Sequence, residues 1–216
     1  MSNRKRFTIL PEFIQQGFLK IIEPIIDVVV RFNVHPHFFT ILGFFLSLIS
    51  GYFFGTHHVT WGGIFLLLSG ICDIFDGKVA RKSGLASKFG AVLDSSLDRY
   101  AEMAVYLGIG IYFIETNQPF TAVMVFVALG GSLMVSYVRA RAEGLGYDGK
   151  VGLMQRPERI VYLGISAVFH PFLLKLVIWG IAILANLTAI QRIYHVYKQE
   201  KEEKESQDTF EESMGI

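Results

Sequence analysis

Residues 73–81 of this chain read Asp73-Ile-Phe-Asp76-Gly77-Lys-Val-Ala-Arg81, and they are followed by Gly90, Asp94 and Asp98. The stretch ends a long apolar run that begins near Trp61. A carboxylate at such a depth in a membrane costs roughly 2.5–3.5 kcal/mol. Four carboxylates in one neighbourhood also repel one another. Bound cations remove both costs, so the cluster predicts a metal site first and an active site second.

The composition indicates an integral membrane protein with one helical domain. Of the 216 residues, 52% are hydrophobic, and several separate apolar runs have spanning length. About 20 residues are needed to cross the hydrocarbon core of a bilayer. The net charge of +1 gives no reason to expect a nucleic-acid partner. We therefore expect an all-α fold whose partners include membrane lipid.

The apolar runs predict six transmembrane helices, with approximate bounds at residues 38–54, 60–81, 90–113, 121–143, 157–169 and 171–196. The third of these helices is expected to start within residues 90–98. Residues 10–32 are amphipathic, and we expect them to form an interfacial helix that lies on the membrane, kinked or split at Pro24. An ordinary amphipathic helix packed on the domain is the alternative. The predicted units are an N-terminal segment (1–35), the six-helix domain (36–198) and a charged, fraying tail (199–216).

The basic residues orient these spans. Lys and Arg occur before the first span, between the second and third, between the fourth and fifth, and after the sixth. The other three connections contain neither. The positive-inside rule then places both termini and the aspartate cluster at the cytoplasmic face of a multi-pass protein of the cell membrane.

The spacing of the aspartates favours a site between two helices. Asp73 and Asp76 are three residues apart, and Asp94 and Asp98 are four apart, so each pair shares one helix face. Oxygen ligands suit hard cations such as Mg²⁺ or Mn²⁺ rather than zinc. Taken singly, each aspartate would more often be solvated or paired with a lysine.

Residues next to the aspartates predict a pyrophosphate ligand. Gly77 permits close approach of a ligand to the backbone, and Arg81, one turn further on, can hold a phosphate in a fork. Ser87 adds a hydroxyl in the linker.

The spacing Asp73-x2-Asp76-Gly77-x2-Ala80-Arg81-x8-Gly90-x3-Asp94-x3-Asp98 resembles the complete signature of the CDP-alcohol phosphotransferase family. The resemblance implies a six-helix membrane enzyme, commonly a homodimer, with two Mg²⁺ ions per active site or Mn²⁺ in their place. It implies that all four aspartates bind metal, that the first residue of each pair bridges the ions, and that Asp98 is also the general base. The CDP-lipid would contact Gly77, Arg81 and Ser87 together with His37, Phe38, Phe39 and Thr40.

A family enzyme of this kind transfers the phosphatidyl group of CDP-diacylglycerol to an alcohol and releases CMP. Most of the chain resembles the prokaryotic phosphatidylinositol phosphate synthases of this family, whose acceptor is inositol 1-phosphate. By position, the acceptor phosphate would be held by Arg139, Arg156 or Arg159, and Arg192. The chain departs from that subfamily at Arg139, commonly lysine, and at Gln155, commonly glutamate.

Alternatives remain for both the acceptor and the class of protein. Glycerol 3-phosphate would need the same arginines, whereas serine or plain inositol would not. A cation transporter also uses intramembrane carboxylates, but here the acidic residues gather near one face. A membrane prenyltransferase uses aspartate-rich metal sites as well, yet it would need more helices than this chain supplies.

Overall fold

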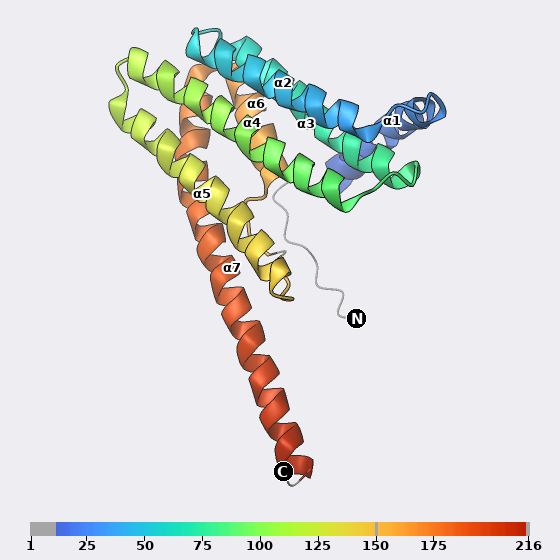
Figure 1. The fold of residues 1–216 in the computed structure, drawn as a ribbon. Helices are drawn as coiled ribbons and strands as arrows, with labels where there is room; N and C mark the ends of the chain where they lie inside the picture. Colours follow the sequence, from blue (N-terminus) through green and yellow to red (C-terminus); the bar gives the residue numbers. More distant parts are fainter. Residues whose placement is uncertain (1–11, 150, 215–216) are drawn as a thin grey trace.

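The computed structural model describes residues 12–149 and 151–214, and it describes side chains for residues 22–149 and 151–208. The described residues form seven helices and are otherwise turns and loops (Figure 1). The helices are α1 (Glu12–Arg31), α2 (Pro36–Gly55), α3 (Val59–Lys82), α4 (Lys88–Glu115), α5 (Pro119–Gly144), α6 (Arg156–Phe169) and α7 (Pro171–Met214). The predicted all-α class is therefore confirmed.

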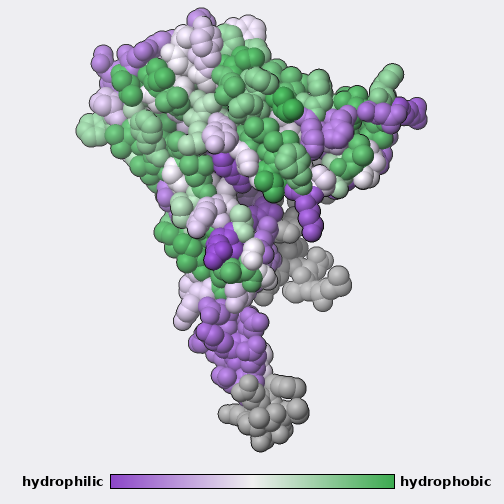
Figure 2. All heavy atoms as spheres, in the orientation of Figure 1, coloured by the Kyte–Doolittle hydropathy of each residue, from purple (hydrophilic) through white to green (hydrophobic). Residues whose placement is uncertain are grey.

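Four of the described helices are long and apolar enough to cross a membrane: α2, α3, α5 and residues 171–208 of α7. The six expected spans lie over α2 to α7, but α4 and α6 differ from the other four. Helix α4 carries charged residues through its first half. Helix α6 has only 14 residues, which is about 21 Å of helix against a hydrocarbon core of about 30 Å. In Figure 2 apolar side chains cover much of the body, whereas the protruding part of α7 is polar.

Two neighbouring groups of helices build the bundle. Helix α2 packs against α3 and α4, α5 packs against α7 and α4, and α6 lies against both α3 and α7. A hydrophobic core that includes Phe54, Tyr106, Ile109 and Ile178 joins these helices. At the crossings of these helices, small residues let the backbones approach closely.

The crossing of α2 and α4 depends on glycine in both helices. A Cβ built on Gly108 would overlap the carbonyl oxygen of Gly51, and a Cβ on Gly51 would overlap that of Ala104. Helices α3 and α6 meet in the same way, since a Cβ on Gly63 would lie 2.7 Å from the carbonyl oxygen of Gly164. These crossings hold α4 against α2 and α6 against α3, and α2 also packs on α3, so the helices that carry the site are held together.

Helix α1 runs from Glu12 to Arg31 through Pro24, so it is not split there. Ile22 and Ile26, on either side of that proline, are buried against Phe75 and Val79 of α3. This packing offsets the backbone hydrogen bond that proline removes. Contacts with α3 agree with a helix packed on the domain. Ile14, Phe18 and Ile21, which also carried the amphipathic prediction, lie outside the residues with described side chains.

The tail beyond residue 198 was expected to be a helical extension that frays, and α7 does continue as helix to Met214. Three ion pairs at i, i+4 spacing, such as Lys204 Nζ to Glu200 Oε1 at 2.8 Å, stabilise it locally. The extension also contacts the α5–α6 connection. Gln199 accepts a hydrogen bond from the Asp148 amide at 3.0 Å and donates one to its carbonyl at 2.9 Å.

The α2–α4 crossing gives a direct test of this packing. We expect Gly108→Ala to lower the unfolding temperature of the purified protein in detergent, because overpacking typically costs about 1–3 kcal/mol. The matched control is Gly130→Ala in α5, where an added Cβ meets nothing within 4 Å. Alanine there should leave the unfolding temperature unchanged or raise it slightly. Equal unfolding temperatures for the two variants would contradict the tight crossing.

Candidate active site

Helices α3 and α4 bring the four aspartates into one neighbourhood. Asp73 and Asp76 lie near the C-terminal end of α3, and Asp94 and Asp98 lie in the first half of α4. The charge of Asp94 acts on Asp73, Asp76 and Asp98, and Asp73 and Asp98 act on each other. Two aspartates from each helix therefore form one partly buried cluster of negative charge.

Arg156, at the first position of α6, is the main counter-charge of this cluster. Its Nη1 lies 2.5 Å from Asp73 Oδ2, and its Nη2 lies 2.7 Å from Asp98 Oδ1. The three side chains are only 18%, 22% and 12% exposed. Arg99 adds a longer contact of 3.2 Å to Asp98. One planar guanidinium thus bridges α3 and α4, whereas the family resemblance implied only a contact of Arg156 with the acceptor phosphate.

Asp76 has the most buried carboxylate of the four, at 7% exposure. Its Oδ2 has no hydrogen-bond partner among the described residues. Thr40 of α2 lies beside the same carboxylate. An unpartnered buried carboxylate oxygen is costly unless a proton or a cation satisfies it.

This donor set fits a hard divalent cation. All the candidate ligands are carboxylate oxygens, and one of them is buried and unpartnered. With Arg156 between Asp73 and Asp98, no group of three or more His, Cys, Asp or Glu side chains in the described part of the chain is arranged to enclose an ion. The arginine and a cation would therefore compete for the same two carboxylates.

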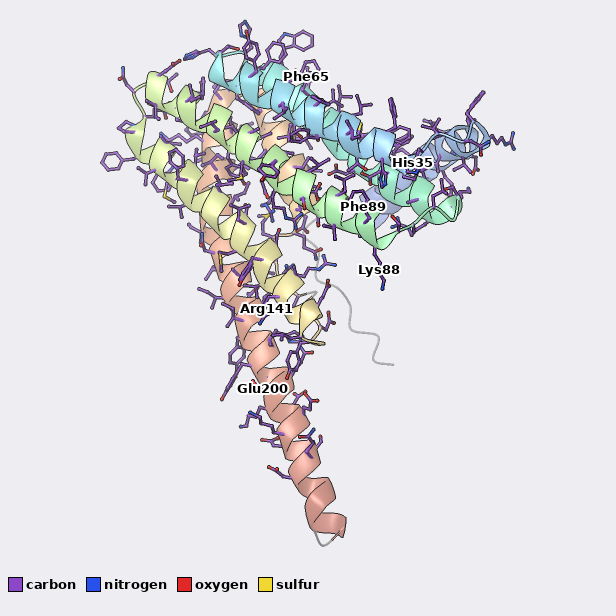
Figure 3. All side chains as sticks on the ribbon, in the orientation of Figure 1. His35, Phe65, Lys88, Phe89, Arg141 and Glu200 are labelled. Carbon is purple, nitrogen blue, oxygen red and sulfur yellow. The ribbon has the colours of Figure 1, made fainter. Side chains whose placement is uncertain are left out.

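The start of α2 contacts both helices that carry the aspartates. The His37 ring meets Phe89 of α4 edge-on at 6.2 Å, and the Phe39 ring lies 5.3 Å from that of Phe75 in α3. Phe38 is 56% exposed. Figure 3 shows His35, the N-cap of α2, close to Phe89 where α2 and α4 begin. The predicted nucleotide-contacting stretch therefore borders the aspartate cluster.

The two signature glycines differ in their surroundings. A Cβ on Gly90 would lie 2.9 Å from His37 Cε1 and 3.0 Å from Ser87 Oγ, so Gly90 allows α4 to pack against α2. A Cβ on Gly77 would meet only the Arg81 guanidinium, at 3.5 Å. The surface of α3 at Gly77 is thus open to a ligand. Ser87 has a structural task, since its Oγ accepts a hydrogen bond from the Gly90 amide at 2.9 Å as the N-cap of α4.

Three of the four predicted acceptor arginines form a second basic cluster. The charges of Arg139 and Arg159 both act on Arg192. Arg192 is 3% exposed, and it donates to the carbonyls of Val135 at 2.5 Å and Val151 at 2.7 Å. These bonds fix the Arg192 guanidinium between α5, α7 and the α5–α6 connection.

The other two arginines of that cluster have acidic partners. Arg139 Nε donates to Glu143 at 3.0 Å on the partly exposed end of α5. Arg159 is buried and donates to Glu102 of α4, a residue that the sequence analysis did not select. The only signal for Glu102 in the sequence is its position four residues after Asp98.

Comparison with known proteins identifies the family and the fold. Residues 33–192 match the CDP-alcohol phosphatidyltransferase family. The chain belongs to this family. The match includes α2 to α6 and the part of α7 that ends at Arg192, and therefore every signature residue of the family.

Relatives within the family include named synthases. The phosphatidylinositol phosphate synthase of Mycobacteroides abscessus is 32% identical over 188 residues, which are 83% of this chain and 85% of that protein. The archaetidylinositol phosphate synthase of Pyrococcus horikoshii is 35% identical, over 75% of this chain and 83% of that protein. A crystal structure of the Mycobacterium tuberculosis phosphatidylinositol phosphate synthase with CDP-DAG bound superposes with a TM-score of 0.74 at 29% identity, covering 82% and 94% of the two chains. Another structure of the same enzyme contains manganese and citrate.

The role of Arg156 as counter-charge can be measured without substrate. We expect Arg156→Gln to lower the unfolding temperature in a chelator, because removing one partner of a buried pair costs about 3–5 kcal/mol. Added Mn²⁺ should then raise the unfolding temperature by more than it does in the wild type. Arg139→Gln is the matched control, since an exposed pair contributes about 0–1 kcal/mol. Indistinguishable responses of the two variants to chelator and Mn²⁺ would refute this role.

Proposed function

We propose that this chain transfers the phosphatidyl group of CDP-diacylglycerol to inositol 1-phosphate, forming phosphatidylinositol phosphate and CMP. The observation that carries the proposal is the arrangement of two opposite charge clusters. The aspartates of α3 and α4 lie beside the open surface at Gly77. The second basic cluster lies on α5, α6 and α7, and two of its three arginines, Arg159 and Arg192, are buried. One cluster suits a pyrophosphate with its cations, and the other suits a phosphate monoester.

On the donor side, the CDP group would lie over Gly77, where α3 offers no side chain beyond Cα. Arg81 is exposed and close to that position, so its guanidinium can bind the pyrophosphate in a bidentate way. His37, Phe38, Phe39 and Thr40 would border the nucleotide from α2. Ser87 would contribute mainly by starting α4 in the right place.

Asp98 is the proposed general base. Its side chain is 12% exposed, which leaves a path to an acceptor hydroxyl while limiting access of water. When two divalent ions are bound to Asp73, Asp76, Asp94 and Asp98, they would supply charge stabilisation for the pyrophosphate. Asp98 takes the proton from the acceptor hydroxyl. The acceptor oxygen forms a bond to the lipid-side phosphorus, and the bond from that phosphorus to the CMP oxygen breaks.

On the acceptor side, Arg139, Arg159 and Arg192 would bind the phosphate of inositol 1-phosphate, with Arg156 between the two charge clusters. Guanidinium groups suit a phosphate because they donate two parallel hydrogen bonds. The departure at Gln155 is compatible with this site. Gln155 and Glu158 form a reciprocal capping box at the start of α6, where glutamine replaces glutamate without loss of the cap.

The membrane arrangement is part of the same proposal. Helices α4 and α6 would complete a six-span bundle, because their charged residues face the site and their apolar residues join the core. Helix α1 would lie at the cytoplasmic interface, with the active site facing the cytoplasm. The units would be 1–35, 36–198 and 199–216, and the family resemblance supports a homodimer.

The experiment is a CMP-release assay on purified enzyme with CDP-diacylglycerol, Mg²⁺ or Mn²⁺, and one acceptor at a time. We expect release with inositol 1-phosphate and little or none with serine or plain inositol, which lack the phosphate. Release with glycerol 3-phosphate but none with inositol 1-phosphate would refute the proposed acceptor while leaving the family chemistry intact.

Asp98→Asn belongs in the same assay as the test of the base. We expect it to abolish transfer, since general base catalysis contributes about 10²–10⁴-fold and the change also removes a ligand charge. Asp208→Asn, on the exposed extension of α7, is the matched control and should keep wild-type activity. Full activity of folded Asp98→Asn would remove Asp98 as the base.

A further inference from the structure

Glu102 continues the line of aspartates deeper into the bundle. It lies on α4 one turn after Asp98 and two turns after Asp94, on the same face of the helix. Its side chain is 8% exposed, so a carboxylate is nearly buried among apolar helices. A carboxylate in such a place is expensive, and this one is outside the signature of the family.

One oxygen of Glu102 holds Arg159. Glu102 Oε1 accepts hydrogen bonds from Arg159 Nε at 2.9 Å and Nη2 at 2.7 Å. Arg159 is itself 1% exposed, and its Nη1 donates to the carbonyl of Met154 at 3.4 Å. The guanidinium is therefore fixed between α4 and the connection that precedes α6. Tyr106, next along the same face of α4, is also beside this pair.

The other oxygen of Glu102 faces no partner. Glu102 Oε2 and Arg156 Nε are both buried without a hydrogen bond among the described residues. Arg156 lies one turn before Arg159 on α6, and the negative charge of Glu102 acts on it together with those of Asp73 and Asp98. Glu102 thus compensates the positive charge of both arginines of α6. It forms hydrogen bonds with Arg159, and its charge acts on Arg156.

We propose that Glu102 is a positioning residue that holds Arg156 and Arg159 for the acceptor phosphate. The inference rests on the proposed function, because it takes these two arginines as acceptor-binding groups. Without the carboxylate, the buried charge of Arg159 would lose its compensation and would repel Arg156 and Arg192 more strongly. Arg159 and Arg192 would then move apart, whereas Arg156 would stay bound to Asp73 and Asp98. The acceptor site would therefore be lost before the donor site, which lies at α2 and α3.

Glu102→Gln tests this role, because glutamine keeps the shape and the accepting oxygen but removes the charge. We expect KM for inositol 1-phosphate to rise about tenfold, the equivalent of one lost charge-assisted hydrogen bond. KM for CDP-diacylglycerol and kcat should stay within about threefold of wild type, because Arg156 keeps its direct contacts with Asp73 and Asp98, and Glu102 contacts neither of these aspartates. Glu102→Asp, which keeps the charge, should recover part of the acceptor affinity.

The matched control is Glu115→Gln at the other end of α4. Glu115 is exposed and pairs with His57 at 2.5 Å, so its loss should leave both KM values unchanged. If Glu102→Gln does not yield folded protein, Glu102→Asp carries the test, with a smaller rise confined to the acceptor KM. A parallel rise in both KM values, or a fall in kcat with an unchanged acceptor KM, would overturn the inference.

Failure of the proposed acceptor is distinguishable from failure of this inference. The wild-type enzyme is assayed first, and absence of activity with inositol 1-phosphate bears on the proposed function alone. If the wild type uses glycerol 3-phosphate, the Glu102 variants are measured with that acceptor. A selective rise in its KM supports the positioning role, and an unchanged KM overturns it.

Discussion

The ionic contact of Arg156 with Asp73 and Asp98 joins three helices at the place where charge is most costly. The aspartates come from α3 and α4, and the arginine is the first residue of α6. In a partly buried setting none of these charges is stable alone, so the helices that carry them must meet. The packing of the helices holds α3, α4 and α6 in the positions that this ionic contact requires.

Small residues allow the helices to cross closely, and polar side chains of α7 bind the connection before α6. Gly51 and Gly108 bring α2 against α4, and Gly63 and Gly164 bring α3 against α6. Thr188 and Arg192 of α7 then bind the connection before α6, through the Met154 amide at 3.2 Å and the Val151 carbonyl at 2.7 Å. The same helix thus carries one of the proposed acceptor arginines, Arg192, and holds the segment that precedes α6.

Sequence alone was sufficient for the local part of this structure. Apolar runs located α2 to α7, and helical spacing placed the aspartates in two pairs, because both signals depend on residues a few positions apart. The contact between Arg156 and Asp73 spans 83 residues, and no local pattern predicts it. Glu102 was missed for the same reason, since its partner Arg159 is 57 residues away. The continuity of α1 through Pro24 depends on packing against α3, which is also long-range.

The aspartate cluster is the proposed binding site for divalent cations, and Mn²⁺ binding to the purified protein tests this most directly. Electron paramagnetic resonance would count the bound ions and detect magnetic coupling between them. We expect two coupled Mn²⁺ ions per chain, reduced to one or none by Asp76→Asn, whose wild-type carboxylate has a buried oxygen without a partner. Absence of stoichiometric Mn²⁺ binding, or binding unaffected by Asp76→Asn, would contradict the account.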